Sequence, residues 1–251
     1  MQAESGRVAE WSNAPVLKTG DGKPSVSSNL TSSANLQRLL FAKEELMVTE
    51  MIIAAFTQSA TIQKDILNLW IKVFYNIGGL LPTSGLSISI QSIEQIDILL
   101  RSMEDEFSSN PHQSHGFEIN YQKIFSEFWV GSAYEITRLL RWRNLAPDNN
   151  DFKVLLRNLE LLRMPLDKHE IASDKKLTAP LIMQRFPEEP GDIDIIYDKN
   201  NMNKSITMPS SITESGSITW CVLDTNTKKQ FWLSRRFLSD CFINIFAKNQ
   251  I

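Results

Sequence analysis

The sequence predicts an α+β protein, with a helical bundle over residues 47–186 and a small unit of β-hairpins with a C-terminal helix over residues 187–251. Two observations support this class. Apolar residues recur every three or four positions from Met47 to Leu162, which is the period of helices that bury one side. After Pro187–Gly191 the pattern changes to short alternating runs separated by turn residues, which is typical of strands.

The first predicted element is one long amphipathic helix over residues 47–77. Its apolar side chains recur at helical steps, from Val48 through Phe56 and Trp70 to Ile77. Two glycines and then Pro82 follow, and these residues end helices because glycine accepts a left-handed cap and proline cannot continue the helix.

The next predicted helix begins at the capping-box pattern Ser92–Gln95 and runs to about Phe107. The preceding residues Leu86–Ile90 alternate between apolar and polar, which predicts a short extended segment. The composition of residues 108–116 predicts a loop.

The third helix has the clearest pattern. One face is expected to hold Tyr121, Ile124, Phe125, Phe128, Trp129, Ser132, Ile136, Leu139 and Leu140. We therefore expect both Phe128 and Trp129 to be buried, and we expect a turn at residues 146–149.

A fourth helix is predicted from Asp151, which suits an N-cap. Its inward face is expected to hold Phe152, Leu155, Leu156, Leu159 and Leu162. Pro165 predicts a break or kink near Met164, and residues 166–186 are expected to form a shorter helix and a packed segment.

The C-terminal unit is predicted to contain a strand at 192–198, a turn, and a return at 205–208. A hairpin follows, with strands 217–223 and 230–233. Ser234 is expected to cap a final helix over residues 235–247 whose apolar side chains, Phe237 among them, pack on the sheet. Trp232 is expected to be covered by the bundle, because an exposed tryptophan requires a partner to explain it.

Residues 1–46 differ from the rest and are expected to be disordered, since they are rich in serine and threonine and lack apolar periodicity. Residues Gly6–Gly20 resemble the conceptual translation of a bacterial serine tRNA gene. Pro15–Gly20 can be encoded by CCG GTC TTG AAA ACC GGT, in which complementary flanks enclose an anticodon loop. Val26–Thr31 can be encoded by a sequence that forms a T-arm. Thr31–Ala34 can be encoded by a sequence that pairs with the codons of Gly6–Val8.

Lys43–Glu45 can likewise be encoded by a ribosome-binding sequence just before Met47. The resemblance therefore implies a spurious extension over residues 1–46, a natural start at Met47 or Met51, and a bacterial cytoplasmic protein. The genomic codons test this expectation, because they must spell the three paired arms.

Composition excludes several classes of protein. The chain has 251 residues and a net charge of -3, and this charge argues against a general polyanion binder. It has only two cysteines, which argues against a disulfide scaffold. No apolar run is long enough to span a membrane. Glycine-rich phosphate loops, zinc-protease motifs and nucleophile elbows are absent from the sequence, which lowers the expectation of an enzyme.

One candidate catalytic pair is Arg163 and His169. Their spacing resembles the Arg-x4–6-His motif of HEPN ribonucleases. The resemblance implies that the histidine transfers a proton and that the arginine stabilises the charge of the phosphorane. Pro165 between them departs from that family's helical motif. The alternative interpretation is a surface loop whose charged side chains cap helix ends.

Two basic and aromatic clusters are candidate surfaces for nucleic acid or a partner protein. They comprise Arg138, Arg141, Trp142 and Arg143, and then Lys228, Lys229, Trp232, Arg235 and Arg236. The favoured interpretation is that the tryptophans belong to the core and that the arginines complement helix dipoles.

His112 and His115 are too few to hold zinc without further ligands, so we expect no metal and no cofactor. Taken together, the sequence favours a non-catalytic interaction or regulatory protein of a bacterial cytoplasm. It is expected to bind an unknown protein or to self-associate through the bundle. Nucleic acid is not the favoured partner, and no membrane association is expected. The alternative is a HEPN-like metal-independent ribonuclease.

Overall fold

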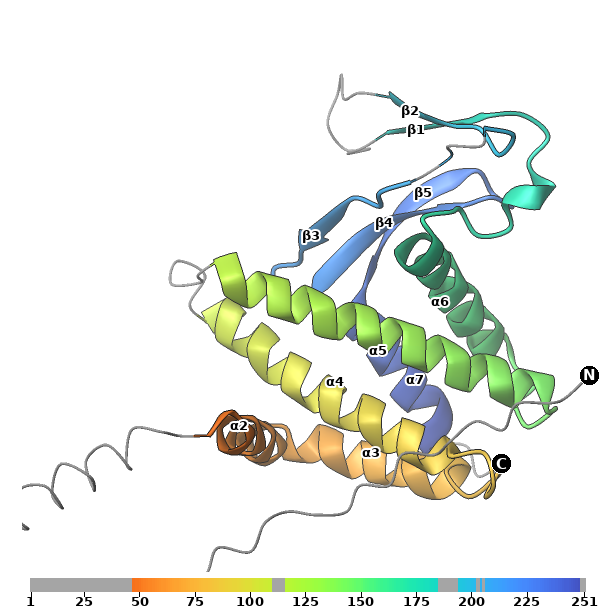
Figure 1. Ribbon diagram of the computed structural model, residues 1–251. Helices are drawn as coiled ribbons and strands as arrows, with labels where there is room; N and C mark the ends of the chain where they lie inside the picture. Colours follow the sequence, from red (N-terminus) through yellow and green to blue (C-terminus); the bar gives the residue numbers. More distant parts are fainter. Residues whose placement is uncertain (1–46, 110–115, 185–193, 202–203, 205, 249–251) are drawn as a thin grey trace, which may run out of the picture. The chain divides into compact units, whose positions relative to one another are not determined.

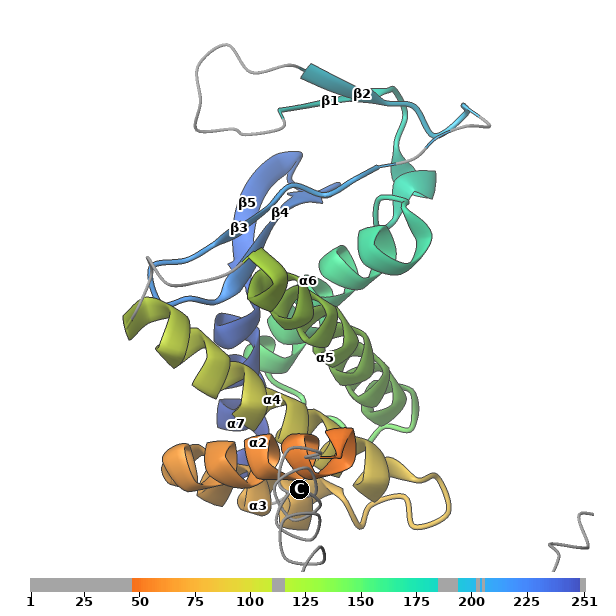
Figure 2. The ribbon, with the colours of Figure 1, turned by 60° about the vertical axis from the view of Figure 1, so that its left-hand side comes forward.

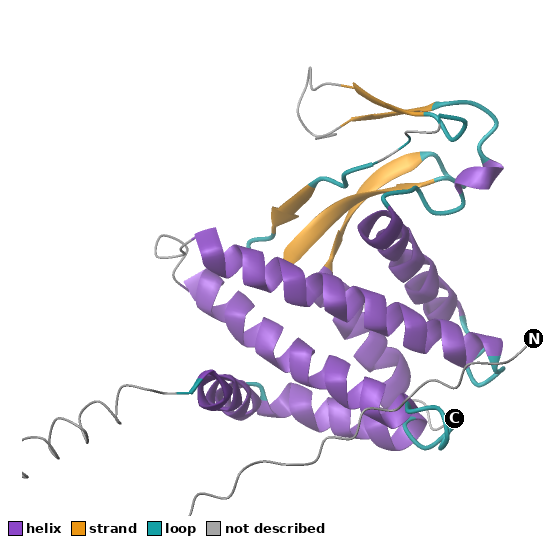
Figure 3. Cartoon of the chain, in the orientation of Figure 1, coloured by secondary structure: helices purple, strands orange, loops and turns teal. Residues whose placement is uncertain are grey.

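The computed structural model describes residues 47–109, 116–184, 194–201, 204 and 206–248, so the expectations for residues 1–46 and for Pro187–Gly191 fall outside it. The chain from Val48 onward forms one compact unit. It combines helices with two antiparallel sheets, which confirms the predicted α+β class (Figure 3).

The helices precede and follow the strands. They are α2 (Val48–Ile62), α3 (Lys64–Ile77), α4 (Leu86–Ser109), α5 (Gly116–Trp142), α6 (Asn150–Lys168) and α7 (Arg235–Lys248), with a short 3-10 turn η1 (Asp174–Lys176) after α6. Helices α4 and α5 run side by side, α6 packs on α5, and α7 packs on α3 and α6 (Figures 1 and 2).

The strands form two antiparallel sheets. Strands β3 (Ser210–Ile212), β4 (Ile218–Asp224) and β5 (Lys229–Ser234) lie in the order β3-β4-β5, and β1 (Leu181–Gln184) pairs with β2 (Asp194–Tyr197). The pairing of Asp224 with Lys229 confirms the predicted hairpin. The return predicted at residues 205–208 is wrong, since β3 begins at Ser210.

The helices and the three-stranded sheet share one core. Trp70, Trp129 and Phe242 lie in it together with Trp220 and Leu233 of the sheet. A smaller cluster under the β1–β2 hairpin contains Ile171, Leu177, Met183, Tyr197 and Ile206. Because α7 continues directly from β5 and packs on α3, the C-terminal segment is joined to the helices by a common core.

The long helix predicted over residues 47–77 is in fact two helices that separate at Gln63. They diverge because α2 packs mainly on α4, whereas α3 packs on both α4 and α7. The Gln63 side chain is buried at the break, where its Nε2 donates to Asp105 Oδ2 at 2.7 Å.

The extended segment predicted at Leu86–Ile90 is also wrong, because α4 already begins at Leu86. Leu86 and Ile90 are buried four residues apart, while Ile88 between them is exposed, so the pattern that seemed to alternate is helical. Ser92 is therefore not an N-cap, and its hydroxyl donates to the carbonyl of Ile88 inside the helix.

Helix α5 buries only part of the face that the sequence predicts. Trp129, Ile136 and Leu140 are buried as expected, but Phe128 is 52% exposed, and Tyr121 and Ile124 are exposed with it. Polar side chains take inward places instead, namely those of Gln122, Ser126 and Thr137. The predicted stripe was too wide, and its outer edge faces away from the core.

The N-cap of α6 lies two residues earlier than predicted, and the helix contains a proline. The cap is Asn149, whose side chain accepts from the Phe152 amide at 2.8 Å, rather than Asp151. The predicted inward residues of this helix are buried. Pro165 does not end the helix, which continues to Lys168 and closes with His169 in the left-handed conformation at φ 55°.

Ser234 caps α7 as predicted, since its hydroxyl accepts from the amide of Phe237 at 3.3 Å. The Phe237 side chain is exposed, however, and does not pack on the sheet. Trp232 is partly buried, and it lies outside the main core, whereas its neighbour Leu233 belongs to that core. The expected cover of Trp232 by the bundle is therefore wrong, because strand alternation places it on the opposite face of the sheet.

Candidate functional site

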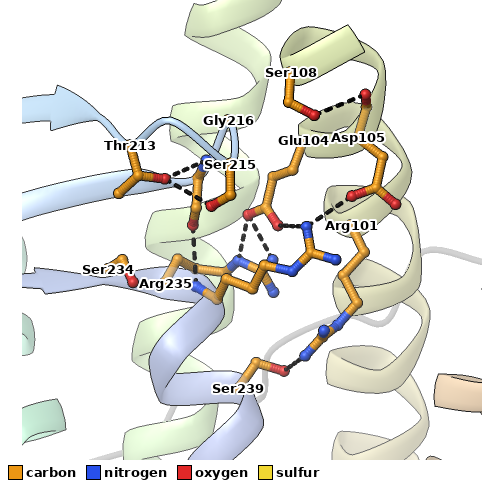
Figure 4. Close-up of polar contacts among 12 residues, drawn as sticks. Arg101, Glu104, Asp105, Ser108, Thr213, Ser215, Gly216, Ser234, Arg235 and Ser239 are labelled. Carbon is orange, nitrogen blue, oxygen red and sulfur yellow. Dashed lines mark hydrogen bonds and ion pairs between the residues drawn. The ribbon is translucent and has the colours of Figure 1, made fainter.

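The most polar place in the interior is a network of charges between α4 and the start of α7. Arg235, Asp97 and Glu104 are all fully buried. Nε and Nη2 of Arg235 donate to Glu104 Oε1 at 3.0 and 2.6 Å (Figure 4). Its Nη1 forms an ion pair with Asp97. One arginine thus neutralises two carboxylates that lie about two turns apart on α4.

A second arginine extends the network along α4. Arg101 Nε donates to Asp97 Oδ2 at 2.9 Å, and Nη2 reaches Ser239 and Asp240 of α7 at 3.0 and 2.6 Å. Trp70 Nε1 donates to the same Asp97 oxygen at 2.8 Å. These bonds join α3, α4 and α7 where they meet.

The turn before β4 closes this network at the end nearest the sheet. Gly216 has φ +78°, and a Cβ at this position would lie 2.3 Å from the backbone oxygen of Glu104, so only glycine allows so close an approach. Arg236 pairs with Asp105 at 2.7 Å and with Glu104 at 3.6 Å.

The electrostatics of Asp97 follow from these contacts. Burial alone would raise the pKa of the Asp97 carboxyl, but the charges of Arg235 and Arg101 and the hydrogen bonds from Ser239 and Trp70 bring the pKa below its ordinary value. A carboxylate held ionised in this way fixes the helices relative to the sheet. Arg235, Asp97 and Glu104 are fully buried and paired with one another, so the network links α4 to α7.

The HEPN-like pair lies on either side of the end of α6. Arg163 is partly buried and forms ion pairs with Asp167 at 2.8 Å and Glu135 at 3.5 Å, and its guanidinium lies 5.4 Å from the Tyr134 ring centroid. His169 is exposed and occupies the C-cap, where its backbone N–H donates to the Pro165 carbonyl.

A groove of about 460 Å³ lies between α4, α5 and α6, and Arg163 lines it while His169 does not. Its walls combine the exposed Ile88 and Phe128 with several serines, and Glu135, Arg138 and Asp167 bring charge to it. The charged groups pair with one another, so the groove offers an apolar wall beside a balanced polar end.

The first basic cluster occupies the C-terminal end of α5. The expectation that Trp142 is a core residue is wrong, because 68% of its surface is exposed. The Arg143 guanidinium lies 4.6 Å from its ring centroid. Arg141 and Arg138 are exposed on the same end of the helix, and Arg138 pairs with Glu135 at 2.7 Å.

The second basic cluster does not form one surface. Arg235 is fully buried among carboxylates, so it cannot contact a ligand outside the protein. Arg236 is bound to two acidic side chains, whereas Lys228 and Lys229 are exposed in and after the hairpin turn. The sequence grouped these residues because they are neighbours in the chain, but they lie in different environments.

The sequence analysis did not identify two features of the structure, the buried ion pair on α4 and the exposed apolar residues of α2. The Asp97–Arg101 pair has the i, i+4 spacing of a helical ion pair and lies among buried apolar residues of α4, which is a readable signal of buried charge. The apolar stripe of α2 follows the predicted helical period, but the sequence does not reveal that much of the stripe is exposed. His112 and His115 lie outside the described residues, and within that part of the chain no cluster of acidic, histidine or cysteine side chains could hold a metal ion.

Helix α2 carries a row of exposed apolar side chains. The α2 face consists of Val48, Met51, Ile52, Ala55 and Ile62, which recur at helical steps and are all exposed. Ser59 is the buried residue of this helix. Glu50 is the single charged side chain between Val48 and Ile62.

Comparison with known proteins gives no relative: no family model, curated protein or solved structure matches the chain. Among the residues that the structure describes, no helix combines the length and the hydropathy needed to cross a bilayer.

Proposed function

We propose that this protein is a non-catalytic interaction protein that binds a partner protein through the α2 face. The observation that carries the proposal is the exposure of Val48, Met51 and Ile52, each more than half accessible, on one side of the first two turns of α2. A contiguous apolar surface on a soluble chain costs solvation free energy unless another surface covers it, and such patches mark interaction sites.

The chemistry of the α2 face favours a protein over a lipid surface as the partner. Helices that lie on anionic membranes carry lysine or arginine on their polar face, and α2 carries neither between Val48 and Ile62. Apolar anchors at i, i+3, i+4 and i+7 are the pattern by which a helix binds an apolar groove of another protein. The partner is therefore a protein with an apolar groove, or a second copy of this chain.

The proposal predicts that Met51→Lys abolishes capture of the partner. A lysine in the centre of the α2 face would have to be desolvated in the complex, so capture should fall about tenfold or more, while the stability of the protein itself changes by less than about 0.5 kcal/mol. The immobilised protein is incubated with a native lysate, and bound proteins are quantified by mass spectrometry. Light scattering over a range of concentrations detects self-association in parallel.

The matched control is Ile182→Lys, because Ile182 is also an apolar residue with more than half of its surface exposed, and it lies on β1. Capture or self-association that survives in Ile182→Lys but not in Met51→Lys supports the α2 face. Equal capture by both variants would show that α2 is not the interaction site.

A HEPN-like ribonuclease is the alternative function. The observation that favours it is the position of Arg163 on the wall of the groove between α4, α5 and α6, where a phosphate group can approach a cation. Incubation of the purified protein with mixed RNA in the presence of a chelator tests it. Cleavage that is lost in His169→Ala would replace the proposal of a non-catalytic protein, and intact RNA would support that proposal.

A further inference from the structure

Trp142 is exposed at a place where the fold does not require a tryptophan. The end of α5 is closed by its neighbours, since the Leu145 amide donates to the Leu140 carbonyl at 2.9 Å and both leucines lie against the core. The charges of Arg141 and Arg143 complement the helix dipole at this end. The dipole explains the arginines, but it leaves the large exposed aromatic surface between them unexplained.

A groove beside Trp142 brings a second aromatic ring to the same place. The groove has a volume of about 440 Å³ and is lined by Tyr134, Arg138, Arg141, Trp142, Leu156 and Glu160. Tyr134 is partly buried on the wall, whereas Trp142 stands at the rim. The groove therefore offers an apolar floor, two aromatic rings and two arginines.

The charges around this groove leave an excess of positive charge. Glu160 is paired with Arg157 at 2.9 Å, and Glu135 with Arg138 at 2.7 Å, so the nearby carboxylates are already neutralised. Arg141 forms no ion pair with another of the described residues. Arg143 is held over the Trp142 ring by a cation–π contact, which keeps its charge beside the aromatic surface.

We propose that this groove, the Trp142 site, binds a phosphorylated nucleobase, either as a free nucleotide or within single-stranded nucleic acid. The base stacks on the exposed part of the Trp142 ring, and Arg141, whose charge is not paired with Glu135 or Glu160, contacts the phosphate. Stacking on an exposed aromatic residue between arginines is how proteins hold unpaired bases without reading their sequence. This site is separate from the α2 face and does not depend on the function proposed for it.

The test is fluorescence anisotropy with a fluorescein-labelled oligoadenylate RNA, using the full chain at low salt. Trp142→Ala should weaken binding by about tenfold, because loss of one stacked base is an effect of this order. Arg141→Gln should lower the slope of log affinity against log salt by about 0.7, as expected for one lost phosphate contact to a single strand. Both positions are exposed, so unchanged circular dichroism is expected to show that the variants fold.

Tyr75→Ala is the matched control, since Tyr75 is an exposed aromatic residue near Lys72 and the last helix, in another groove. Competition by AMP at similar affinity would assign the site to a free nucleotide, and competition only by unlabelled oligonucleotides, RNA or DNA, would assign it to single strands. The proposal is overturned if no oligonucleotide binds. It is also overturned if polyphosphate competes as well as RNA and Trp142→Ala binds like the wild type.

Discussion

Replacing Arg235 with methionine is expected to lower the free energy of unfolding by about 3–5 kcal/mol, because the substitution leaves two buried carboxylates without their shared cation. Asp97 and Glu104 are both inaccessible to water, and Arg235 contacts each of them. Methionine fills a similar volume, so the loss reports the missing charge rather than a cavity. Urea unfolding followed by circular dichroism measures the change.

The same substitution should alter the dependence of stability on pH. The pKa of Asp97 lies below its ordinary value, although burial acts to raise it, because Arg235 and Arg101 favour the carboxylate. A lowered folded pKa contributes stability above the unfolded pKa of about 3.9, and this contribution is lost as the pH falls through the folded pKa. Without Arg235 the pKa of Asp97 rises, so acid unfolding of Arg235→Met should begin at a higher pH than that of the wild type.

Two further variants separate charge from packing. Glu104→Gln, added to Arg235→Met, should recover part of the lost stability, because a neutral amide no longer requires the cation, whereas Asp97 still has Arg101 as its partner. Arg236→Met should cost less than Arg235→Met, since the Arg236 side chain is partly exposed to water. A cost of less than about 1 kcal/mol for Arg235→Met alone would contradict the assignment of this network as the link between α4 and α7.

Most of the elements could be predicted because their local signals agree. The hairpin between β4 and β5 combines alternating strands with a turn at Asp224, and α7 begins where Ser234 caps it. The break at Gln63 could not be predicted, since the apolar period continues through it. Only the tertiary partners of α2 and α3 separate the two helices.

The candidate sites were harder to predict for a related reason. Spacing along one helix reveals the pair of Asp97 and Arg101, but Arg235 follows Asp97 by 138 residues, and only the fold brings them together. Composition does single out Arg141, Trp142 and Arg143. Exposure then decides between a core residue and a binding residue, and exposure depends on how α5 rotates against its neighbours.

The rotation of α5 leads to the second large effect, which compares two adjacent aromatic residues. Trp129→Ala is expected to cost about 3–5 kcal/mol of unfolding free energy, because its side chain is fully buried and contacts the Phe242 ring with centroids 6.3 Å apart. Phe128→Ala is expected to cost less than about 1 kcal/mol, because more than half of its surface is already in water.

Each of the two variants is the control for the other. They remove an aromatic side chain from neighbouring positions of one helix and gain the same alanine, so helix propensity contributes similarly to both. Urea midpoints measured under one set of conditions give the difference directly. Similar costs for both variants would mean that α5 is rotated so that Phe128 as well as Trp129 contacts the core, whereas more than half of the Phe128 surface is exposed. A large cost confined to Phe128→Ala would place the wider apolar edge of α5, with Tyr121 and Ile124, against the core after all.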